Sequence, residues 1–244
     1  MPRSHFNKNF RILANREGDR TNFTPADIPN IMGWWKADDL DATLNDGDDV
    51  TTWEDKTANN YDLAQAVAND KPHFKTAIIG THDVVRFAEA PNTEDMACAT
   101  VPETAQPFTI AVVAATSTAT DVIVSGNVAL KDALINSTAA GVYGMEAGTQ
   151  LSSLTADGAT PRLIHAEFNG TLSRIWVNNQ HPFTQGNAGA QPIEDLIVGS
   201  NQAASLHLTG DIAEMVLVSG IMPDLYRDLL WRYLKAIYSL TGTP

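Results

Sequence analysis

An acidic cluster between residues 46 and 62 is the first group of side chains that could do chemistry. Its members are Asp46, Asp48, Asp49, Glu54, Asp55 and Asp62. Calcium takes several oxygen ligands, so such a cluster could hold this ion. The spacing does not follow the EF-hand loop, however, and Asp46-Gly47-Asp48 is typical of a turn. We predict no metal and no cofactor, with calcium at Asp46, Asp48 and Asp55 as the alternative, and we expect Asp55 to brace the Asn59-Asn60 loop.

Paired carboxylates for glycan cleavage are the next possibility, and they require two acids on one face of a strand. Asp211 and Glu214 are three residues apart, which on a regular strand sends them to opposite faces. Glu194 and Asp195 are adjacent and fail the same test. The six histidines show no metal-binding spacing, and the sequence contains neither a nucleophile elbow nor a phosphate-binding glycine loop. The sequence therefore predicts a protein that is not an enzyme, with a glycan hydrolase as the second alternative.

Tryptophan side chains could provide a platform on which sugar rings stack. Strand alternation sends Trp34 and Trp35 to opposite faces, and it sends Trp176 away from Ile175 and Val177. Trp176 is therefore expected on the second face of its sheet or exposed. We predict Trp35 and Trp176 as contacts for a glycan or a protein partner, with core packing as the alternative.

Short strands separated by turns account for most of the chain. The predicted strands are 108–116, 121–126, 161–170, 173–180, 194–200 and 210–219. Turn signals such as Asn169-Gly170 and Asn178-Asn179 separate them. This spacing predicts a single sandwich or barrel domain over residues 28–244, with no βαβ units.

One helix is predicted at the carboxyl-terminal end, directly after the last strand. Pro223 suits a first helical turn, and Gly242 is a suitable stop. An apolar stripe follows a four-residue step. Its members are Leu225, Leu229, Tyr233 and Ile237, with Tyr226, Leu230 and Leu234 beside them. Such a stripe must cover something, and we expect it to cover an edge or rim of the sandwich.

Charge is unevenly distributed along the chain. The net charge is −13, from 16 basic and 29 acidic residues, yet residues 1–20 contain five basic and two acidic ones. The acidic body argues against nucleic acid binding. Residues 1–27 are predicted to be an extended arm that docks on another subunit through Arg3, Phe6, Phe10 and Arg11, with a disordered terminus as the alternative.

The single cysteine, Cys98, allows no disulfide within the chain, and neither a secretory signal nor a membrane span is visible. Synthesis and folding in a reducing cytoplasm are therefore expected.

Four segments together resemble the concanavalin A-like jelly rolls of the laminin G-like type, which occur in phage structural proteins. The segments are IMGWWKADDL (31–40), DGDDVTTWEDKTANNYDLAQ (46–65), RLIHAEFNGTLSRIWVNNQ (162–180) and GDIAEMVLVSGIMPDLYRDLLWRYLKAIYSL (210–240). The resemblance implies an all-β, two-sheet antiparallel sandwich with Trp34 and Trp53 at core positions. The family's turn glycine is missing after Lys56, and we expect the two asparagines to adopt left-handed conformations in its place.

The resemblance, the arm and the lack of a secretion signal together favour a non-enzymatic bacteriophage virion protein. We expect a capsid decoration or tail fibre component, anchored by its arm to the major capsid or tail protein, made in the host cytoplasm and located in the virion. Closed symmetry is the usual mode of assembly, and a homotrimer is the expected oligomer. A carbohydrate-binding module or adhesin for host glycans is the first alternative. No nucleic acid or membrane partner is expected.

Overall fold

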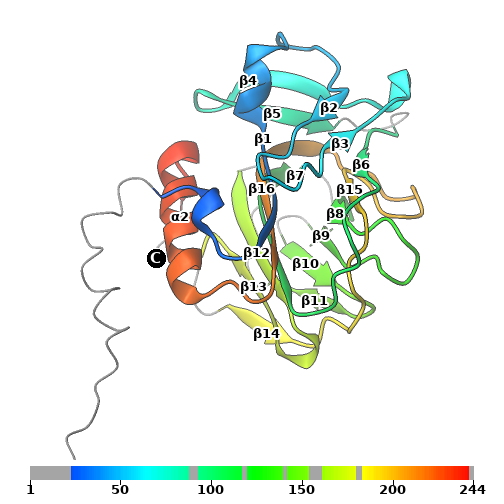
Figure 1. The fold of residues 1–244 in the computed structure, drawn as a ribbon, viewed down its shortest axis with the longest axis vertical. Coiled ribbons are helices and arrows are strands. Elements are labelled where there is room, and N and C mark those ends of the chain that lie inside the picture. The colour runs from blue at the N-terminus through cyan, green and yellow to red at the C-terminus, as the bar shows by residue number, and fades with distance from the viewer. Residues whose placement is uncertain are drawn as a thin grey trace, which may run out of the picture.

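The computed structural model describes residues 23–87, 93–116, 120–139, 142–153, 161–179 and 183–241. Two eight-stranded sheets make up most of this part of the chain, and their strand pairs are antiparallel (Figure 1). The described chain is therefore a two-sheet β-sandwich with one α-helix, as predicted from the sequence.

The first sheet has the strand order β14-β13-β12-β7-β16-β5-β4, and β1 also pairs with β16. The long strand β16 pairs with β5 through its first residues and with β1 through its later ones. The strands are β1 (Ile31–Lys36), β4 (His73–Ile79), β5 (His82–Phe87), β7 (Phe108–Thr116), β12 (Arg162–Phe168), β13 (Ser173–Val177), β14 (Thr184–Gly186) and β16 (Gly210–Ser219).

The second sheet has the order β11-β10-β9-β8-β15-β6-β3-β2. Its strands are β2 (Thr52–Trp53), β3 (Leu63–Ala64), β6 (Met96–Cys98), β8 (Val122–Ser125), β9 (Leu134–Ala139), β10 (Val142–Glu146), β11 (Gln150–Ser152) and β15 (Leu196–Val198). In the described ranges, four short 3-10 helices join strands or precede them: η2 (Pro25–Asp27), η3 (Ala37–Ala42), η4 (Ala68–Asp70) and η5 (Gly170–Leu172).

The strands predicted from apolar runs are confirmed. β7 and β16 have the predicted bounds, and β8, β12, β13 and β15 lie inside their predicted ranges. The Asn169-Gly170 signal marks the hairpin between β12 and β13, which η5 closes. Asn178 and Asn179 both adopt positive φ, at 51° and 53°, as their predicted turn requires.

The main core lies between the two sheets. Phe108 and Phe168 stack there with ring centroids 4.6 Å apart, and Trp35 and Trp53 are buried in the same cluster. Cys98 is also buried in this cluster, as expected of a small apolar residue.

A second apolar layer covers the outer face of the first sheet. Helix α2 (Asp224–Tyr238) packs there through Leu230, Trp231 and Leu234, and Figure 1 shows it lying beside the sheet. The sheet residues beneath the helix include Trp34, Val84, Ala111, Val113, Leu163, Val216 and Val218. Because β7 and β16 are apolar on both faces, the uncovered face would expose a large apolar surface.

The predictions for this helix need three corrections. It covers a face of the sheet and not an edge or rim. Its most buried residues are Arg227, Leu230, Trp231, Leu234 and Tyr238, whereas Leu225 of the predicted stripe is exposed. The helix also ends before Gly242, which lies outside the described residues, because Ser239 already adopts the left-handed conformation at φ 51°.

A β-bulge in β16 changes which way its residues face. The ladder with β7 shifts register between Ile212 and Glu214. Ile212 and Met215 lie in the core between the sheets, whereas Ala213 lies under α2. Glu214 also faces α2, where it contacts Tyr238. Two successive side chains therefore point outward, and the expected alternation of Asp211 and Glu214 is wrong.

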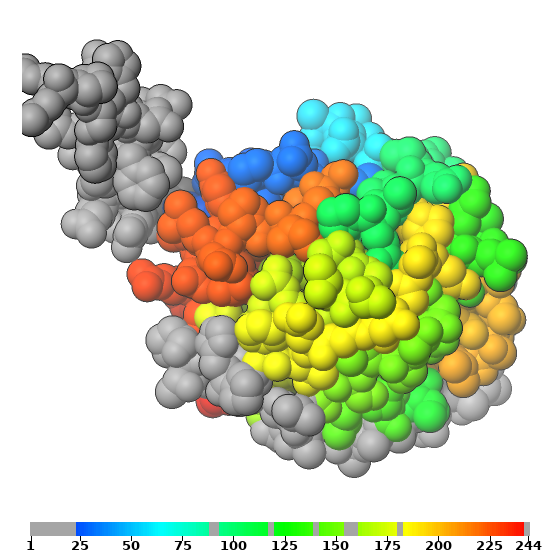
Figure 2. Space-filling view, turned by 90° about the horizontal axis from the view of Figure 1, so that it is seen from below, coloured from blue at the N-terminus to red at the C-terminus, as the bar shows by residue number. Residues whose placement is uncertain are grey.

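The chain joins this packing earlier than the predicted boundary at residue 27. The ring of Phe23 packs edge-on against Tyr233 of α2 with centroids 6.1 Å apart, and Pro25 is buried. In Figure 2 the blue segment after Phe23 lies beside the orange helix. The body of the domain therefore includes Phe23.

Candidate functional site

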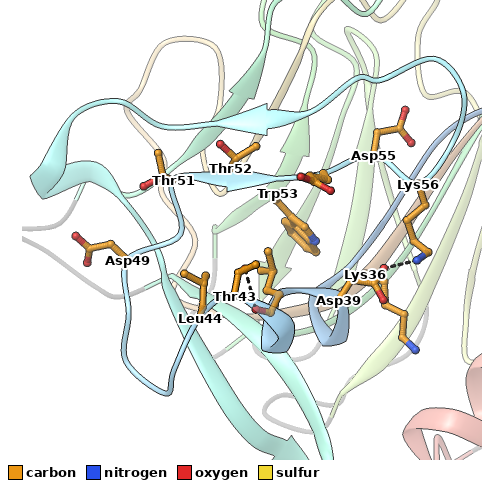
Figure 3. Close-up of a pocket in the computed structure, with 12 residues that line it drawn as sticks. Lys36, Asp39, Thr43, Leu44, Asp49, Thr51, Thr52, Trp53, Asp55 and Lys56 are labelled. Atoms are coloured by element: carbon orange, nitrogen blue, oxygen red, sulfur yellow. Dashed lines mark hydrogen bonds and ion pairs between the residues drawn. The ribbon is translucent and has the colours of Figure 1, made fainter.

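A pocket of about 510 Å³ opens where η3 and the loop after it face the segment that contains β2 (Figure 3). The lining residues are Lys36, Asp39, Leu40, Thr43, Leu44, Asp49, Thr51, Thr52, Trp53, Glu54, Asp55 and Lys56. This volume lies within the range of about 300–1,000 Å³ that is usual for small-molecule sites.

The sequence of η3 explains how one wall is built. Ala37 and Leu40 are buried in the main core, so they fix the short helix against the sheets. Asp39 lies on the exposed side of the same turn, with its side chain 46% exposed. On the opposite wall, Thr52 of β2 is exposed, whereas Trp53 points inward. Both walls therefore present polar groups to the pocket from rigidly packed elements.

Asp55 holds the loop that follows β2. Its Oδ1 accepts hydrogen bonds from the backbone N–H groups of Trp34 and Thr57, both at 2.9 Å. Its Oδ2 accepts from the Thr57 hydroxyl at 2.7 Å and from the Tyr61 N–H at 3.0 Å. The predicted bracing role of Asp55 is confirmed. Of the two adjacent asparagines, Asn60 takes the expected left-handed conformation at φ 55°, whereas Asn59 does not adopt a positive φ, so the expectation is wrong for Asn59.

Two lysines lie in the pocket, and each has an acidic partner. Lys36 lies 3.0 Å from Asp38, and Lys56 forms an ion pair with Asp39. The Lys56 ammonium also lies 4.8 Å from the centre of the Trp34 ring, which attracts a cation to its face. Burial alone would raise the pKa of Asp38, but hydrogen bonds from Asp83, His82 and Lys36 lower it.

The floor of the pocket is apolar but offers no open aromatic face. Trp53 is 1% exposed, and its Nε1 has no hydrogen-bond partner. Leu40 is also buried. A ligand in this pocket would therefore contact carboxylates, ammonium groups and hydroxyls, and would gain little from ring stacking.

Behind the pocket, Glu214 is buried between the sheet and α2. Its Oε1 accepts a hydrogen bond from Trp34 Nε1 at 2.7 Å, and its Oε2 accepts one from the Tyr238 hydroxyl at 2.8 Å. Burial raises the pKa of Glu214 to about 7, although these two hydrogen bonds act in the opposite direction. The pKa of Tyr238 is raised by burial and by the Glu214 charge. The Trp34 side chain thus links the pocket to the helix, because its ring lies under Lys56 and its Nε1 donates to Glu214.

Carboxyl groups with raised pKa values are candidates for general acids, and three occur in the described residues. They are Glu214, Asp95 with a pKa of about 6, and Asp195. Burial is the first cause in each case. None of the three lines the pocket, and Glu214 is only 1% exposed. A substrate in the pocket would not reach them.

The predicted contact tryptophans are not at the surface, which corrects the prediction for both residues. Trp35 is fully buried between the sheets and donates from Nε1 to the Tyr61 carbonyl at 3.0 Å. Trp176 is 1% exposed, with the guanidinium groups of Arg174 and Arg227 at 5.3 and 4.9 Å from its ring. Both therefore serve packing. Trp34 and Trp53 lie at core positions, as the resemblance implied.

A second buried polar cluster surrounds Trp176. Glu167 is fully buried 2.6 Å from Arg174, and His165 lies 3.5 Å from the same carboxylate. Burial lowers the pKa of His165 despite this neighbour. The cluster connects β12 and β13 with Arg227 of α2, and it strengthens the attachment of the helix.

The acidic residues suggested for calcium do not converge on one point. Asp46 contacts Lys75 at 2.9 Å, and Asp48 accepts from the Asn45 N–H at 2.7 Å. Asp55 is occupied by its own loop. Within the described ranges, no three His, Cys, Asp or Glu side chains are grouped as a metal site would require.

The arm residues Arg3, Phe6, Phe10 and Arg11 lie outside the described residues. None of the helices in the described part is long and apolar enough to cross a membrane.

Sequence reasoning missed the pocket residues Lys36, Asp39 and Lys56. A signal was present, because these residues lie in or beside the two segments that carry the family resemblance. Both KADDLDAT (36–43) and WEDK (53–56) combine a lysine with two or more acidic residues, and the fold brings these two polar stretches together. Only the packing of η3 beside β2 shows that they face one space.

Comparisons with known proteins place the fold but not a family. No protein-family model matches the chain, and no curated protein matches it. Several solved structures do match this chain. Domain 4 of the arabinanase AbnA from Geobacillus stearothermophilus, in complex with arabinotriose, matches with a TM-score of 0.53 at 9% identity, covering 83% of this chain and 99% of that one.

Two larger proteins contain a similar domain. The receptor-binding domain of botulinum neurotoxin type G matches with a TM-score of 0.55 at 9% identity, over 84% of this chain and 51% of that one. Trypanosoma rangeli sialidase, in complex with sialic acid, matches with a TM-score of 0.51 at 12% identity, covering 97% of this chain and 40% of that one. The chain thus spans about half of the first of these two chains and 40% of the second. Such low identities show the fold alone, which is a two-sheet β-sandwich.

Proposed function

We propose that this chain is a non-catalytic glycan-binding domain and that the pocket between η3 and β2 is its binding site. The observation that carries the proposal is the pocket's mixed lining. Exposed carboxylate, ammonium and hydroxyl groups line one space from two rigid walls. A sugar ring carries hydroxyls that both donate and accept hydrogen bonds, so it can use all three kinds of group.

Structural neighbours support this proposal by analogy. The arabinanase domain was solved with arabinotriose, and the toxin domain is a receptor-binding domain. A fold hosts many functions, so the argument depends on the pocket and not on these proteins.

The positions of the carboxylates support the absence of catalysis. Hydrolysis of a glycosidic bond needs one carboxyl group that donates a proton and a second that acts as nucleophile or base. Two of the four carboxylates in the pocket lining are already engaged, because Asp55 accepts four hydrogen bonds and Asp39 is paired with Lys56. The acid with a pKa near 7, Glu214, is sealed under α2.

A glycan array probed with the fluorescently labelled full-length chain tests this function. Asp39→Asn and Lys56→Gln should each weaken binding, because each removes a charged hydrogen-bonding group from the pocket. Lys131→Gln is the matched control, since Lys131 forms its ion pairs with Glu103 and Glu194 outside the pocket. An array without any signal, or equal binding by all variants, would contradict the proposal. Release of reducing ends from the bound glycans would contradict the non-catalytic part.

We also propose, as the sequence suggested, that the domain is displayed on a bacteriophage particle as a homo-oligomer. Its support is the contrast between the basic first twenty residues and the acidic remainder. Glycan binding and display are compatible, because an adhesin needs an anchor. Co-sedimentation of the full chain with capsids or tails, lost on deletion of residues 1–22, is the expected result. A chain that stays monomeric and binds no particle would refute it.

A further inference from the structure

We infer that the pocket selects neutral glycans and discriminates against glycans that carry carboxylate, sulfate or phosphate groups. The inference rests on the proposed function, because it concerns the ligand class of the same site. Its basis is the distribution of charge around the pocket, which no comparison addresses.

Neither lysine of the pocket is available to an anion without a cost. Lys36 lies 3.0 Å from Asp38, which also accepts from the Asp83 N–H at 2.8 Å. Lys56 is paired with Asp39 and lies over the Trp34 ring. An anionic sugar that approached Lys56 would have to compete with the Asp39 carboxylate for the same ammonium group. A hydroxyl group has no such conflict, because it can accept from Lys56 while it donates to Asp39.

The remaining charges of the lining are negative. Asp49, Glu54 and Asp55 line the pocket in addition to Asp39, which gives four carboxylates against two ammonium groups. Among the described residues, the ion-pair partner of the Asp49 carboxylate is His73, whose Nδ1 lies 3.4 Å from Oδ1. Glu54 is exposed and forms no ion pair within the described part of the chain. An anion in this space therefore meets like charges at short range.

The electrostatic field of the whole chain also disfavours anionic ligands. The net charge is −13, and the excess of acids is larger still beyond the first twenty residues. A negative body lowers the local concentration of anions and slows their association, particularly at low ionic strength. The local and the global charge thus agree in disfavouring anionic ligands.

The mode of recognition also fits neutral sugars of modest affinity. Thr51 and Thr52 are exposed on the wall opposite Asp39, so hydroxyl donors and acceptors are available on both sides. The ring of Trp53 is covered, and the lining within the described residues offers no exposed aromatic face. Binding would therefore depend on hydrogen bonds to hydroxyls, with a dissociation constant of about 0.1–1 mM for one site.

The test uses one glycan array that contains neutral glycans and their sialylated, sulfated and uronic acid counterparts, at about 50 mM salt. We expect the bound glycans to be neutral, and each anionic counterpart to bind about tenfold more weakly. Raising the salt concentration to about 500 mM should lower the ratio of neutral to anionic glycan affinity while leaving the affinity for neutral glycans unchanged. Preferential binding of anionic glycans would overturn the inference and leave the glycan-binding function intact.

A charge-reversal variant provides an independent readout. Glu54→Lys should raise the ratio of anionic to neutral glycan binding about tenfold. Because Glu54 is exposed, this variant should fold like the wild type, which its circular dichroism and melting temperature would verify. Unchanged discrimination in Glu54→Lys would overturn the electrostatic argument. If neither protein bound any glycan on the array, the proposed function itself would fail.

Discussion

Replacing Glu214 with glutamine should remove the decline in the free energy of unfolding that ionisation of Glu214 causes as the pH rises. The carboxyl group is buried between Trp34 and Tyr238, and its pKa is raised from 4.5 to about 7. A raised pKa means that the folded state binds the proton more tightly than the unfolded state. The contribution of Glu214 to stability is therefore fully present below about pH 4.5, and it is lost as the pH rises through about 7.

The magnitude follows from the difference between the two pKa values. Each pKa unit corresponds to about 1.4 kcal/mol, so Glu214 makes the wild type less stable at pH 8 than at pH 4.5 by about 3 kcal/mol. Glutamine has the same shape and keeps an oxygen acceptor for Trp34 Nε1, but it carries no charge to bury. The free energy of unfolding of Glu214→Gln should consequently lack this decline.

Urea denaturation followed by tryptophan fluorescence, at steps from pH 4.5 to 8.5, measures the effect. Other groups also titrate in this range: the pKa of Asp95 is raised to about 6, and that of His165 is lowered. The difference between wild type and variant at each pH cancels their contributions, provided that both proteins unfold in two states. Glu54→Gln serves as the control, because it removes an exposed carboxylate.

Parallel stability curves for wild type and Glu214→Gln across this pH range would refute the reasoning. They would mean that the buried carboxyl keeps the same protonation state in the folded and unfolded chains. A further variant, Glu214→Leu, checks the hydrogen bonds separately. It leaves the donors of Trp34 and Tyr238 without their acceptor, which should make it less stable than Glu214→Gln by about 1–3 kcal/mol per buried donor at every pH.

Three further outcomes are expected from urea denaturation of other variants. Trp176→Ala should lower the free energy of unfolding by about 3–5 kcal/mol and leave glycan affinity unchanged, because the ring is buried away from the pocket; weaker glycan binding by a folded variant would contradict this. Asp55→Ala should cost about 3 kcal/mol or more and abolish glycan binding, whereas Asp46→Ala, which breaks a surface ion pair, should cost less than about 1 kcal/mol. Equal effects of the two aspartate changes would refute the bracing role. Deleting residues 1–22 should leave stability unchanged, and extending the deletion through residue 27 should lower it by about 1–3 kcal/mol, since buried side chains are lost.

The sandwich could be predicted because its central strands carry a strong local signal. Residues 108–116 and 210–219 are apolar on both faces, as strands must be when a sheet packs on one side and a helix on the other. Turn residues such as Asn178 adopt the conformations that their type favours. These features depend on neighbours in sequence, so the sequence alone is sufficient to find them.

Features that depend on distant segments could not be predicted in the same way. Alternation placed Trp176 on the outer face of its sheet, but the burial of that face depends on Arg227 and on the helix that carries it. The bulge at Ala213 leaves no mark in the sequence pattern. The pocket joins Lys56 to Asp39, seventeen residues apart, through the packing of η3 against the core.

The extra residue in β16 decides more than the direction of one side chain. If β16 kept Ala213 but had no bulge, regular alternation would turn the Glu214 carboxylate into the space between the sheets and turn Met215 out toward the helix. The bulge thus keeps an ionisable group out of the space between the sheets, and it keeps Ile212 and Met215 in the main core on either side of it. Deleting Ala213 would remove the bulge and restore regular alternation from Ile212 to Glu214, so Glu214, Met215 and the residues after them would keep the faces that they have now.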